Sequence, residues 1–449
     1  MLKKYHIKTW GCQMNVYDSQ RIAEILQSLG YEETKELGMA DIIILNTCHI
    51  REKATEKVYS DLGRLRILKE RRKTIGKNLI IGVSGCVAQA EGEEILKRAP
   101  VVDLVFGPQT WHRLASMIKK IEENHIAVCD TDFPVEEKFD NLPEFFDANR
   151  IQYGSAFVAI QEGCDKFCTY CVVPYTRGAE YSRPVHQVLE EVHQLVHAGA
   201  KEITLLGQNV NAYHGYLNET TEWSLGQLIR KISTINGVEA IRYTTSYPAE
   251  VDEDLIAAHQ DVAKLAPFLH LPLQSGSNKI LKLMNRKHTV EEYLKLITRL
   301  KEANPNLAIS SDFIVGFPEE TEEDFLATLQ VIKTVGFIQS YAFMYSPRLG
   351  TPAALYEKQI PQSLKEERLH RLQEVLATSQ YNFNKSTVGK EFSLLLNRTG
   401  RKEQQLVGKS PYMQAVRIED ASPNLLGQTV RVKVCNAYAN SLVAEIIQG

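Results

Sequence analysis

The 449-residue sequence is short of long apolar runs and of net charge. No stretch reaches the roughly 20 apolar residues that a membrane-spanning helix needs. The start, MLKKYHIKTWGC, runs into a strand-like segment without the apolar core of a signal peptide. We therefore expect no membrane partner and a cytoplasmic location. The formal net charge of −3 does not exclude a nucleic acid partner, because a local basic patch is enough to bind one.

Three of the eight cysteines form a CxxxCxxC triplet, Cys164, Cys168 and Cys171, in EGCDKFCTYCVVPYTRG. Three closely spaced thiolates can hold three irons of a 4Fe-4S cluster and leave the fourth iron open for another ligand. The sequence lacks the nearby second CxxC pair or finger-spaced histidines that a structural zinc site needs. Three uncoordinated thiols would be an oxidation liability. The triplet therefore favours a cluster over zinc and over a purely structural role.

Three further cysteines each end a short apolar run: Cys12 follows IKTWG, Cys48 follows DIIILNT and Cys86 follows LIIGVSG. A helix-like segment comes after each run, and this alternation predicts a doubly wound parallel sheet. Carboxyl ends of parallel strands meet at one edge, so the three cysteines either hold a second cluster there or serve as small buried hydrophobes. Their equivalent positions favour a ligand set. Cys129 and Cys435 lie outside both triplets, and we interpret them as structural.

The composition and the pattern of apolar residues change twice along the chain, which predicts three domains. Residues 1–130 carry the sheet pattern, and residues 131–150 are acidic and contain two prolines, as in a linker or wrapping arm. Residues 151–380 contain six strand-like runs separated by helical segments, which predicts a parallel barrel or part of one. Residues 381–449 contain short strand-like runs split by Gly, Asn and Pro, which predicts a small β-barrel. The fold class is α/β.

The triplet, with the aromatic Tyr170 before its last cysteine, resembles the signature of the radical S-adenosylmethionine superfamily. The resemblance implies that S-adenosylmethionine binds the open iron and is cleaved to a 5'-deoxyadenosyl radical. The chemistry then belongs to the cofactor, while the protein orients it and excludes water.

Polar residues at the predicted strand ends are candidates to bind S-adenosylmethionine. They are Gln208, Asn209, Ser246, Gln274 and Asp312, and two further candidates are Gly207 of the same rim and Tyr170 of the cysteine triplet. The alternatives are ordinary: Gly207 also suits a turn, and strand-end Ser or Asp residues often cap helices.

Basic residues concentrate in two places. Residues 381–449 hold nine lysines and arginines against five aspartates and glutamates, a net charge of +4. A small basic barrel resembles the TRAM module, an RNA-binding appendage. The second place is RLRILKERRK, with Arg64, Arg66, Lys69, Arg71, Arg72 and Lys73. This run indicates either a solvated helix face or a set of phosphate contacts.

Taken in order, the three domains resemble the methylthiotransferase family, and the MiaB type within it. The matching stretches are KTWGCQMNVYDS, LNTCHIREKA, GCVAQAEGE, FGPQT, GCDKFCTYCVVPYTRG, SRP, LLGQNVNAY, LPLQSGS and SSDFIVGFPEET. One departure is His49, where relatives often have Ser after the second cysteine.

The resemblance implies a radical methylthiotransferase that inserts sulfur and a methyl group at carbon 2 of prenylated adenosine, at position 37 of tRNA. Cys12, Cys48 and Cys86 would hold an auxiliary 4Fe-4S cluster that carries the sulfur, beside the Cys164, Cys168 and Cys171 cluster. The implied partners are a tRNA anticodon stem-loop, a small electron-transfer protein such as flavodoxin or ferredoxin, and a sulfur donor.

Three rival functions stay open. Two are methylthiotransferases that act on threonylcarbamoyladenosine in tRNA or on an aspartate of a ribosomal protein. The VVPYTRG sequence after the third cysteine of the triplet favours the methylthiotransferases that act on prenylated adenosine. The third is a non-catalytic iron-sulfur regulator that binds RNA.

Overall fold

The computed structural model describes residues 2–48, 52–141 and 146–447. The chain forms two compact units. The first consists of Met1–Ala148, Glu162–Asp165 and Val172–Tyr181, and the second of the remaining residues. His49, the departure from the family pattern, lies outside the described ranges.

The first unit is built on a six-stranded parallel sheet in the order β2-β1-β3-β4-β5-β6. The strands are β1 (Lys3–Thr9), β2 (Tyr31–Glu33), β3 (Ile42–Thr47), β4 (Ile80–Gly85), β5 (Leu104–Phe106) and β6 (Val128–Asp130). The order reverses between β1 and β3, so this is a doubly wound sheet, and its switch point is where such sheets place ligands.

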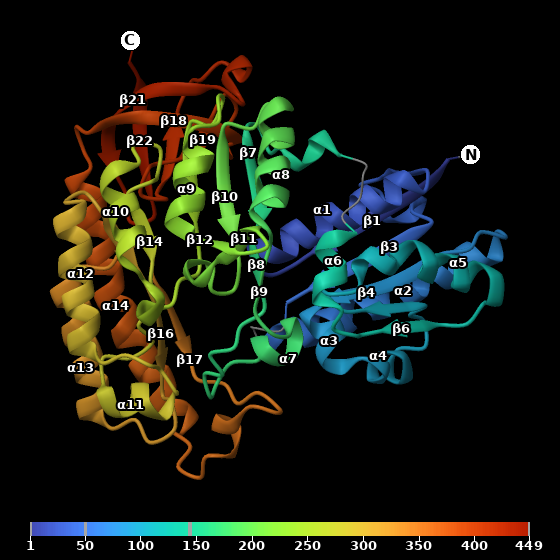
Figure 1. Cartoon of the computed structure of the whole chain (residues 1–449). Coiled ribbons are helices and arrows are strands. Elements are labelled where there is room, and N and C mark those ends of the chain that lie inside the picture. The colour runs from blue at the N-terminus through green and yellow to red at the C-terminus, as the bar shows by residue number, and fades with distance from the viewer. Residues whose placement is uncertain (1, 49–51, 142–145, 448–449) are drawn as a thin grey trace. The chain divides into compact units, whose positions relative to one another are not determined.

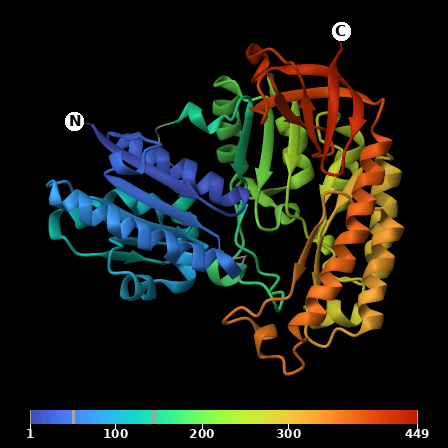
Figure 2. The same cartoon turned by 180° about the vertical axis from the view of Figure 1, so that it is seen from behind.

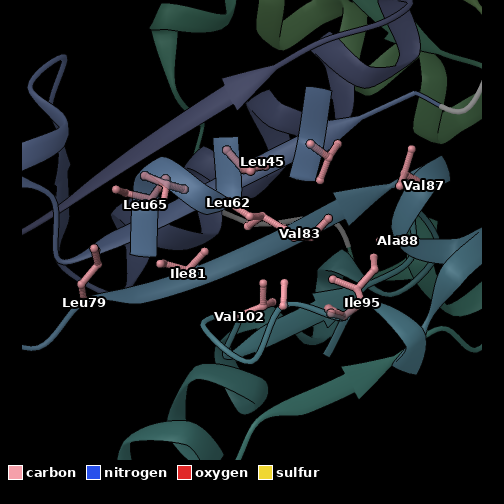
Figure 3. Close-up of a cluster of buried hydrophobic side chains, with 14 of the residues drawn as sticks. Leu45, Leu62, Leu65, Leu79, Ile81, Val83, Val87, Ala88, Ile95 and Val102 are labelled. Atoms are coloured by element: carbon pink, nitrogen blue, oxygen red, sulfur yellow. The ribbon is translucent and has the colours of Figure 1, made fainter. Parts of the chain in front are cut away.

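Helices cover both faces of this sheet (Figure 1). They are α1 (Gln13–Ser28), α2 (Glu52–Thr74), α3 (Cys86–Glu91), α4 (Glu93–Arg98) and α5 (Leu114–Asn124). Alternate residues of β3 and β4 point to opposite faces. Leu45, Ile81 and Val83 pack under α2, α3 and α4 in the core of Figure 3, while α1 and α5 pack on the other face.

The segment expected as a linker belongs to the first unit over its described part up to Ala148. It forms the short helix α6 (Val135–Asp140), and Lys138 and Phe139 of this helix are buried. Phe139 stacks on Tyr181, and the Lys138 ammonium lies over the Trp111 ring.

The second unit contains parallel strands at the six expected positions. They are β7 (Ser155–Ala159), β10 (Glu202–Leu206), β13 (Ala240–Tyr243), β14 (Phe268–His270), β15 and β16 (Ala308–Ser310 and Asp312–Val315) and β17 (Tyr341–Met344). Isolated bridges from Ile241 to Leu265 and from Gln274 to Phe313 continue the pairing between the sheet fragments. The result is the expected partial barrel.

Helices connect these strands on the outside of the barrel (Figure 1). They are α8 (Val185–His197), α9 (Leu225–Ser233), α10 (Glu253–Asp261), α11 (Asn278–Leu283), α12 (Val290–Ala303), α13 (Glu322–Val335) and α14 (Gln362–Ser386). The hairpin β11 (His214–Asn218) and β12 (Thr221–Ser224) follows β10. The long helix α14 packs against α13 and β17 (Figure 2, orange).

The second unit ends in a closed barrel, in the order β18-β19-β20-β22-β21 (Figure 1, red). Its strands are β18 (Glu391–Thr399), β19 (Leu406–Lys409), β20 (Ala415–Ile418), β21 (Thr429–Ala437) and β22 (Ser441–Ile446). Inward residues such as Leu394, Val416 and Val432 are fully buried. Helix α14 runs past residue 381, where we expected the barrel domain to begin.

Three short elements lie where the chain passes between the units. Strands β8 (Gln161–Glu162) and β9 (Tyr181–Ser182) pair with each other, and α7 (Val173–Arg177) belongs to the first unit.

In the described part of the chain, no helix is both long and apolar enough to span a bilayer.

Candidate functional site

Cys12, Cys48 and Cys86 follow three neighbouring strands, β1, β3 and β4, at their carboxyl ends. Cys12 is the N-cap of α1, and Cys86 begins α3. Parallel pairing places Thr9 opposite Asn46 and Thr47 opposite Gly85, so the three strands end at nearly one level. The structure thus brings this set to one edge, at the switch point between β1 and β3.

Glycines before two of these cysteines permit the close approach. Gly11 has φ +126° and Gly85 has φ +86°, a region that favours glycine. A Cβ on Gly11 would lie 2.3 Å from the Cys48 Cβ, and one on Gly85 would lie 2.4 Å from the Thr47 carbonyl oxygen. Any larger residue would push the strand ends apart.

Two buried asparagines tie the loops together. The Asn46 amide donates to the Asn15 carbonyl and to Ser19 Oγ, both at 2.9 Å. The Asn15 amide donates to the Trp10 carbonyl, and its Oδ1 accepts from the Cys12 thiol at 3.4 Å. These bonds hold the cysteine-bearing loops in place without a covalent link, and none of the eight cysteines, all of them described, forms a disulfide.

The thiols of this edge have unequal acidity. A hydrogen bond from Cys48, helped by the Arg177 charge, lowers the pKa of Cys12 to about 6. Burial raises the pKa of Cys86, while Arg177 acts against that rise. Since the thiolate is the metal ligand, Cys12 is better prepared than Cys86 to bind metal. Over the described residues, no three His, Cys, Asp or Glu side chains already form a metal-binding group.

The CxxxCxxC triplet straddles the two units. Cys164 belongs to the first unit, where its N–H donates to the Gly178 carbonyl at 3.2 Å. Cys168 and Cys171 belong to the second, where the Cys171 N–H donates to the Cys168 carbonyl at 2.9 Å. A common site for the three thiols therefore stays a prediction from their spacing.

The end of α11 anchors the loop that carries Cys168. Thr169 donates its N–H to the Met284 carbonyl and its hydroxyl to the Leu283 carbonyl, at 3.1 and 2.9 Å. Thr169 and Leu283 also line a hollow of about 630 Å³. The loop is thus held on a rigid helix end rather than left loose.

Arg286 is a buried cation beside this loop. Its Nη1 lies 3.7 Å from Cys168 Sγ, and its Nη2 donates to the Pro272 carbonyl at 2.6 Å. Its guanidinium stacks over the Tyr247 ring at 4.2 Å. Tyr170 packs edge-on against Phe317, and burial raises its pKa well above the ordinary value. At neutral pH Tyr170 is therefore an uncharged, apolar wall of the loop.

The loop after β10 is organised by Gln161. Its Oε1 accepts from the N–H groups of Gln208 and Asn209, at 2.9 and 3.0 Å. A Cβ on Gly207 would lie only 2.5 Å from this oxygen. Gly207 is therefore required for packing against Gln161, whatever else this loop binds.

Asn209 and Ser246 carry orphaned polar atoms. Asn209 is 2% exposed and Ser246 is 5% exposed. Neither the amide oxygen and nitrogen of Asn209 nor the hydroxyl of Ser246 has a hydrogen-bond partner among the described residues. Buried polar groups are nearly always satisfied, so both residues have the free capacity that a polar ligand would use.

The remaining expected rim residues already have partners. Gln274, at φ +77°, donates its N–H to the Asp312 carbonyl and accepts from the Ile314 N–H, at 2.9 and 3.0 Å. The Asp312 carboxylate lies 3.3 Å from His270 Nε2. Gly316, which follows β16, leaves room for the Lys365 side chain, which a Cβ would meet at 2.4 Å.

Three family models match the chain in order. Residues 4–107 match the family described as uncharacterized protein family UPF0004. Residues 158–332 match the radical SAM superfamily, and residues 385–447 match the TRAM domain. The chain has the architecture of MiaB-type methylthiotransferases.

Solved structures resemble the fold of this chain. One is the radical S-adenosylmethionine methyltransferase TsrM from Kitasatospora setae, with cobalamin and a 4Fe-4S cluster bound. It is 13% identical, with a TM-score of 0.57, and the match covers 79% of this chain and 77% of TsrM. The cobalamin-dependent radical enzyme OxsB is 14% identical with a TM-score of 0.55, over 84% of this chain but only 57% of OxsB. These likenesses concern the fold alone.

The radical SAM domain implies an enzyme with a 4Fe-4S cluster and S-adenosylmethionine. The residues of the second unit fit such a ligand, because the orphaned Asn209 and Ser246 groups follow β10 and β13 at their carboxyl ends. The TRAM domain suggests RNA binding. A larger cavity of about 900 Å³ lies elsewhere, between the amino ends of β10 and β13 and the C-terminal barrel.

The basic run on α2 divides into two groups. Arg72 is buried and binds Asp41 at 2.5 Å, and Lys69 binds Asp103 at 2.5 Å. The exposed members of the run are Arg64, Arg66, Arg71 and Lys73. Only the four exposed residues can face solvent or contact phosphates. Both interpretations of the run therefore concern these four residues alone.

Sequence reasoning missed four buried charged residues of the first unit that lie together: Asp18, Lys138, Glu162 and Arg177. Asp18 and Arg177 stand inside quoted motifs, KTWGCQMNVYDS and GCDKFCTYCVVPYTRG, but nothing in their spacing marks them as buried. Charged residues are almost never fully buried unless paired. Their presence beside the cysteines is a finding of the structure.

Proposed function

We propose that this protein is a tRNA methylthiotransferase that converts N(6)-isopentenyladenosine at position 37 into its 2-methylthio derivative. The observation that carries the proposal is the set of strand-end cysteines at the β1–β3 switch point, in a chain that also has radical SAM and TRAM domains. The bond between carbon 2 and hydrogen is not acidic enough for a side-chain base near neutral pH. A radical generator suits that substrate.

In this proposal the CxxxCxxC triplet and the polar rim of the second unit prepare the radical chemistry. Cys164, Cys168 and Cys171 hold the irons, and the orphaned groups of Asn209 and Ser246 bind S-adenosylmethionine. When bound, the cluster and S-adenosylmethionine supply a carbon-centred radical that attacks an unactivated carbon. Arg286 stays charged beside Cys168 and compensates thiolate charge, while Tyr170 keeps water from the loop.

The first unit serves sulfur transfer. Cys12, Cys48 and Cys86 would hold an auxiliary 4Fe-4S cluster, which would supply the sulfur, and one of two S-adenosylmethionine molecules would supply the methyl group. The lowered pKa of Cys12 supports its part in this set. The C-terminal barrel binds the tRNA anticodon stem-loop, in line with its net charge of +4 over residues 381–449. A small electron-transfer protein such as flavodoxin or ferredoxin, and a sulfur donor, complete the cycle.

Paired cysteine variants test the division of labour. Cys164→Ala should abolish release of 5'-deoxyadenosine, because the cluster that binds S-adenosylmethionine loses a ligand. Cys12→Ala should retain that release and stop sulfur transfer to tRNA. Cys435→Ala, on an exposed strand residue, is the matched control and should change neither product. A Cys12→Ala protein that methylthiolates tRNA normally would exclude the auxiliary cluster.

The substrate is decided by mass analysis of nucleosides from a strain that lacks the gene. We expect loss of the 2-methylthio group from prenylated adenosine alone. Loss from threonylcarbamoyladenosine, or a change confined to a ribosomal protein aspartate, would overturn the substrate assignment but keep the reaction class. Absence of 5'-deoxyadenosine from reduced, fully reconstituted protein would instead support a non-catalytic RNA-binding regulator.

A further inference from the structure

Arg177 is a buried cation at the edge that carries Cys12, Cys48 and Cys86. It ends α7 and is only 2% exposed. Its Nη2 donates to Asp18 Oδ2 at 2.8 Å, and its Nη1 donates to Glu162 Oε1 at 2.5 Å. The Gln109 amide donates to its carbonyl at 2.6 Å. The guanidinium is therefore fixed on several sides.

A second buried cation shares the same carboxylates. Lys138 is fully buried, with its Nζ 2.5 Å from Glu162 Oε2 and 3.5 Å from Asp18 Oδ1. Two cations thus stand against two carboxylates, and their formal charges cancel. If Cys12, Cys48 and Cys86 are thiolates, they add negative charge beside this otherwise neutral group of four side chains.

Of the two cations, Arg177 is the one that reaches the cysteines. Helix α7, which Arg177 ends, packs against α3, which Cys86 begins. The Arg177 Nη2 also lies 3.4 Å from Asn15 Oδ1, the atom that accepts from the Cys12 thiol. Lys138 instead contacts the rings of Trp111 and Phe139.

We propose that Arg177 is a positioning residue for the auxiliary cluster, whose buried positive charge compensates the thiolates and raises the cluster's reduction potential. The inference rests on the proposed function, because it needs a cluster at Cys12, Cys48 and Cys86. Charge, hydrogen bonding and burial around the ligands set the potentials of such clusters. A positive charge stabilises the state with one more electron, so its removal disfavours reduction.

A structural role alone explains the arrangement less well. Buried ion pairs are weak evidence for stability, because desolvation offsets their attraction. Lys138 already binds both carboxylates. The two cations and the two carboxylates balance one another, so charge balance does not set Arg177 apart; its contact with Asn15 Oδ1, the acceptor of the Cys12 thiol, does.

The test uses the full-length chain with Cys164, Cys168 and Cys171 replaced by Ala, so that only the auxiliary cluster remains. After anaerobic reconstitution, its reduction is followed by electron paramagnetic resonance during a dithionite titration. Arg177→Gln should lower the ratio of reduced to oxidised cluster at a given potential by about tenfold, a shift of about 59 mV for one electron. Arg177→Lys should restore most of the ratio. Lys138→Gln, the matched control, removes a buried cation from the same carboxylates and should shift it much less.

A charge-balanced variant guards against misfolding. Arg177→Gln leaves Asp18 and Glu162 with one cation, so Arg177→Gln/Glu162→Gln is measured as well. Because the Arg177 guanidinium contacts Asn15 beside the Cys12 thiol, its loss should leave part of the downward shift in this charge-balanced variant. Equal potentials for the Arg177→Gln, Lys138→Gln and parent proteins would overturn the role of Arg177 and keep the auxiliary cluster. A parent protein that takes up no iron would overturn the auxiliary cluster and this inference together.

Discussion

At the scale of single residues, the clearest sign of a ligand is the pair of unsatisfied side chains at Asn209 and Ser246. A buried polar group without a partner costs about 1–3 kcal/mol. The fold tolerates this cost twice in one rim, after β10 and after β13. Proteins usually keep such destabilising side chains only at sites that bind a ligand or a substrate.

Asn209→Ala should therefore separate binding from folding. We expect the urea unfolding free energy of the apoprotein to stay the same or rise, since no protein hydrogen bond is lost. The Kd for S-adenosylmethionine on reconstituted protein should rise about tenfold, which corresponds to about 1.4 kcal/mol. Equilibrium dialysis and urea titration measure the two effects.

The matched control is Gln161→Ala. Gln161 holds the same loop through two hydrogen bonds to its backbone, so its loss should reduce both stability and binding. If Asn209→Ala instead destabilises the protein and leaves the Kd unchanged, the amide serves the fold and not a ligand.

At the scale of elements, the ends of β1, β3 and β4 depend on glycine. The strands themselves follow from their apolar runs, and β3 is buried along its whole length. Their close approach depends on Gly11 and Gly85, whose missing side chains leave room for the Cys48 and Thr47 segments. The positions of Cys12, Cys48 and Cys86 at one edge of the sheet thus depend on the turns after the strands as much as on the strands themselves.

Gly85→Ala tests this dependence. The new Cβ would meet the Thr47 carbonyl at 2.4 Å in a backbone with φ +86°, and a strained residue of this kind costs about 1–3 kcal/mol. We expect a lower urea midpoint and weaker iron retention in the chain that carries only the auxiliary cysteines. Gly82→Ala in the same strand meets Ile44 at an ordinary 3.4 Å and should change both far less. Equal effects of the two substitutions would contradict a special role for the turn.

At the scale of the whole molecule, the chain places two cysteine sets in one polypeptide that also carries a TRAM barrel. The spacing of the first set and the strand-end positions of the second predict two clusters rather than one. Two open clusters distinguish a sulfur-inserting enzyme from a simple electron carrier, whose four-cysteine sites are closed.

Iron and sulfide analysis after anaerobic reconstitution measures this directly. We expect about eight irons per chain, and about four after replacement of Cys12, Cys48 and Cys86 or of Cys164, Cys168 and Cys171, because each set holds about four. A value near four for the unaltered chain, lost entirely in one of the two variants, would leave a single cluster and refute the proposed reaction.

The periodicity of the sequence determined much of the architecture. One of the expected helical segments between the six strand-like runs is α12, Val290–Ala303, which begins with the Thr289 and Glu292 capping box. The six runs became the strands of the partial barrel, and the cysteine runs became β1, β3 and β4. These features depend on near neighbours in the chain, which a sequence displays directly.

Tertiary structure alone decided which charges meet the thiols. Arg177 binds Asp18 across 159 positions of sequence, and the pairing exists only because α7 belongs to the first unit. The orphaned amide of Asn209 and the stacking of Arg286 on Tyr247 are equally invisible to periodicity. Spacing fixes the ligands because they lie on neighbouring turns and strand ends, whereas the electrostatic surroundings of those ligands depend on segments that fold back from far along the chain.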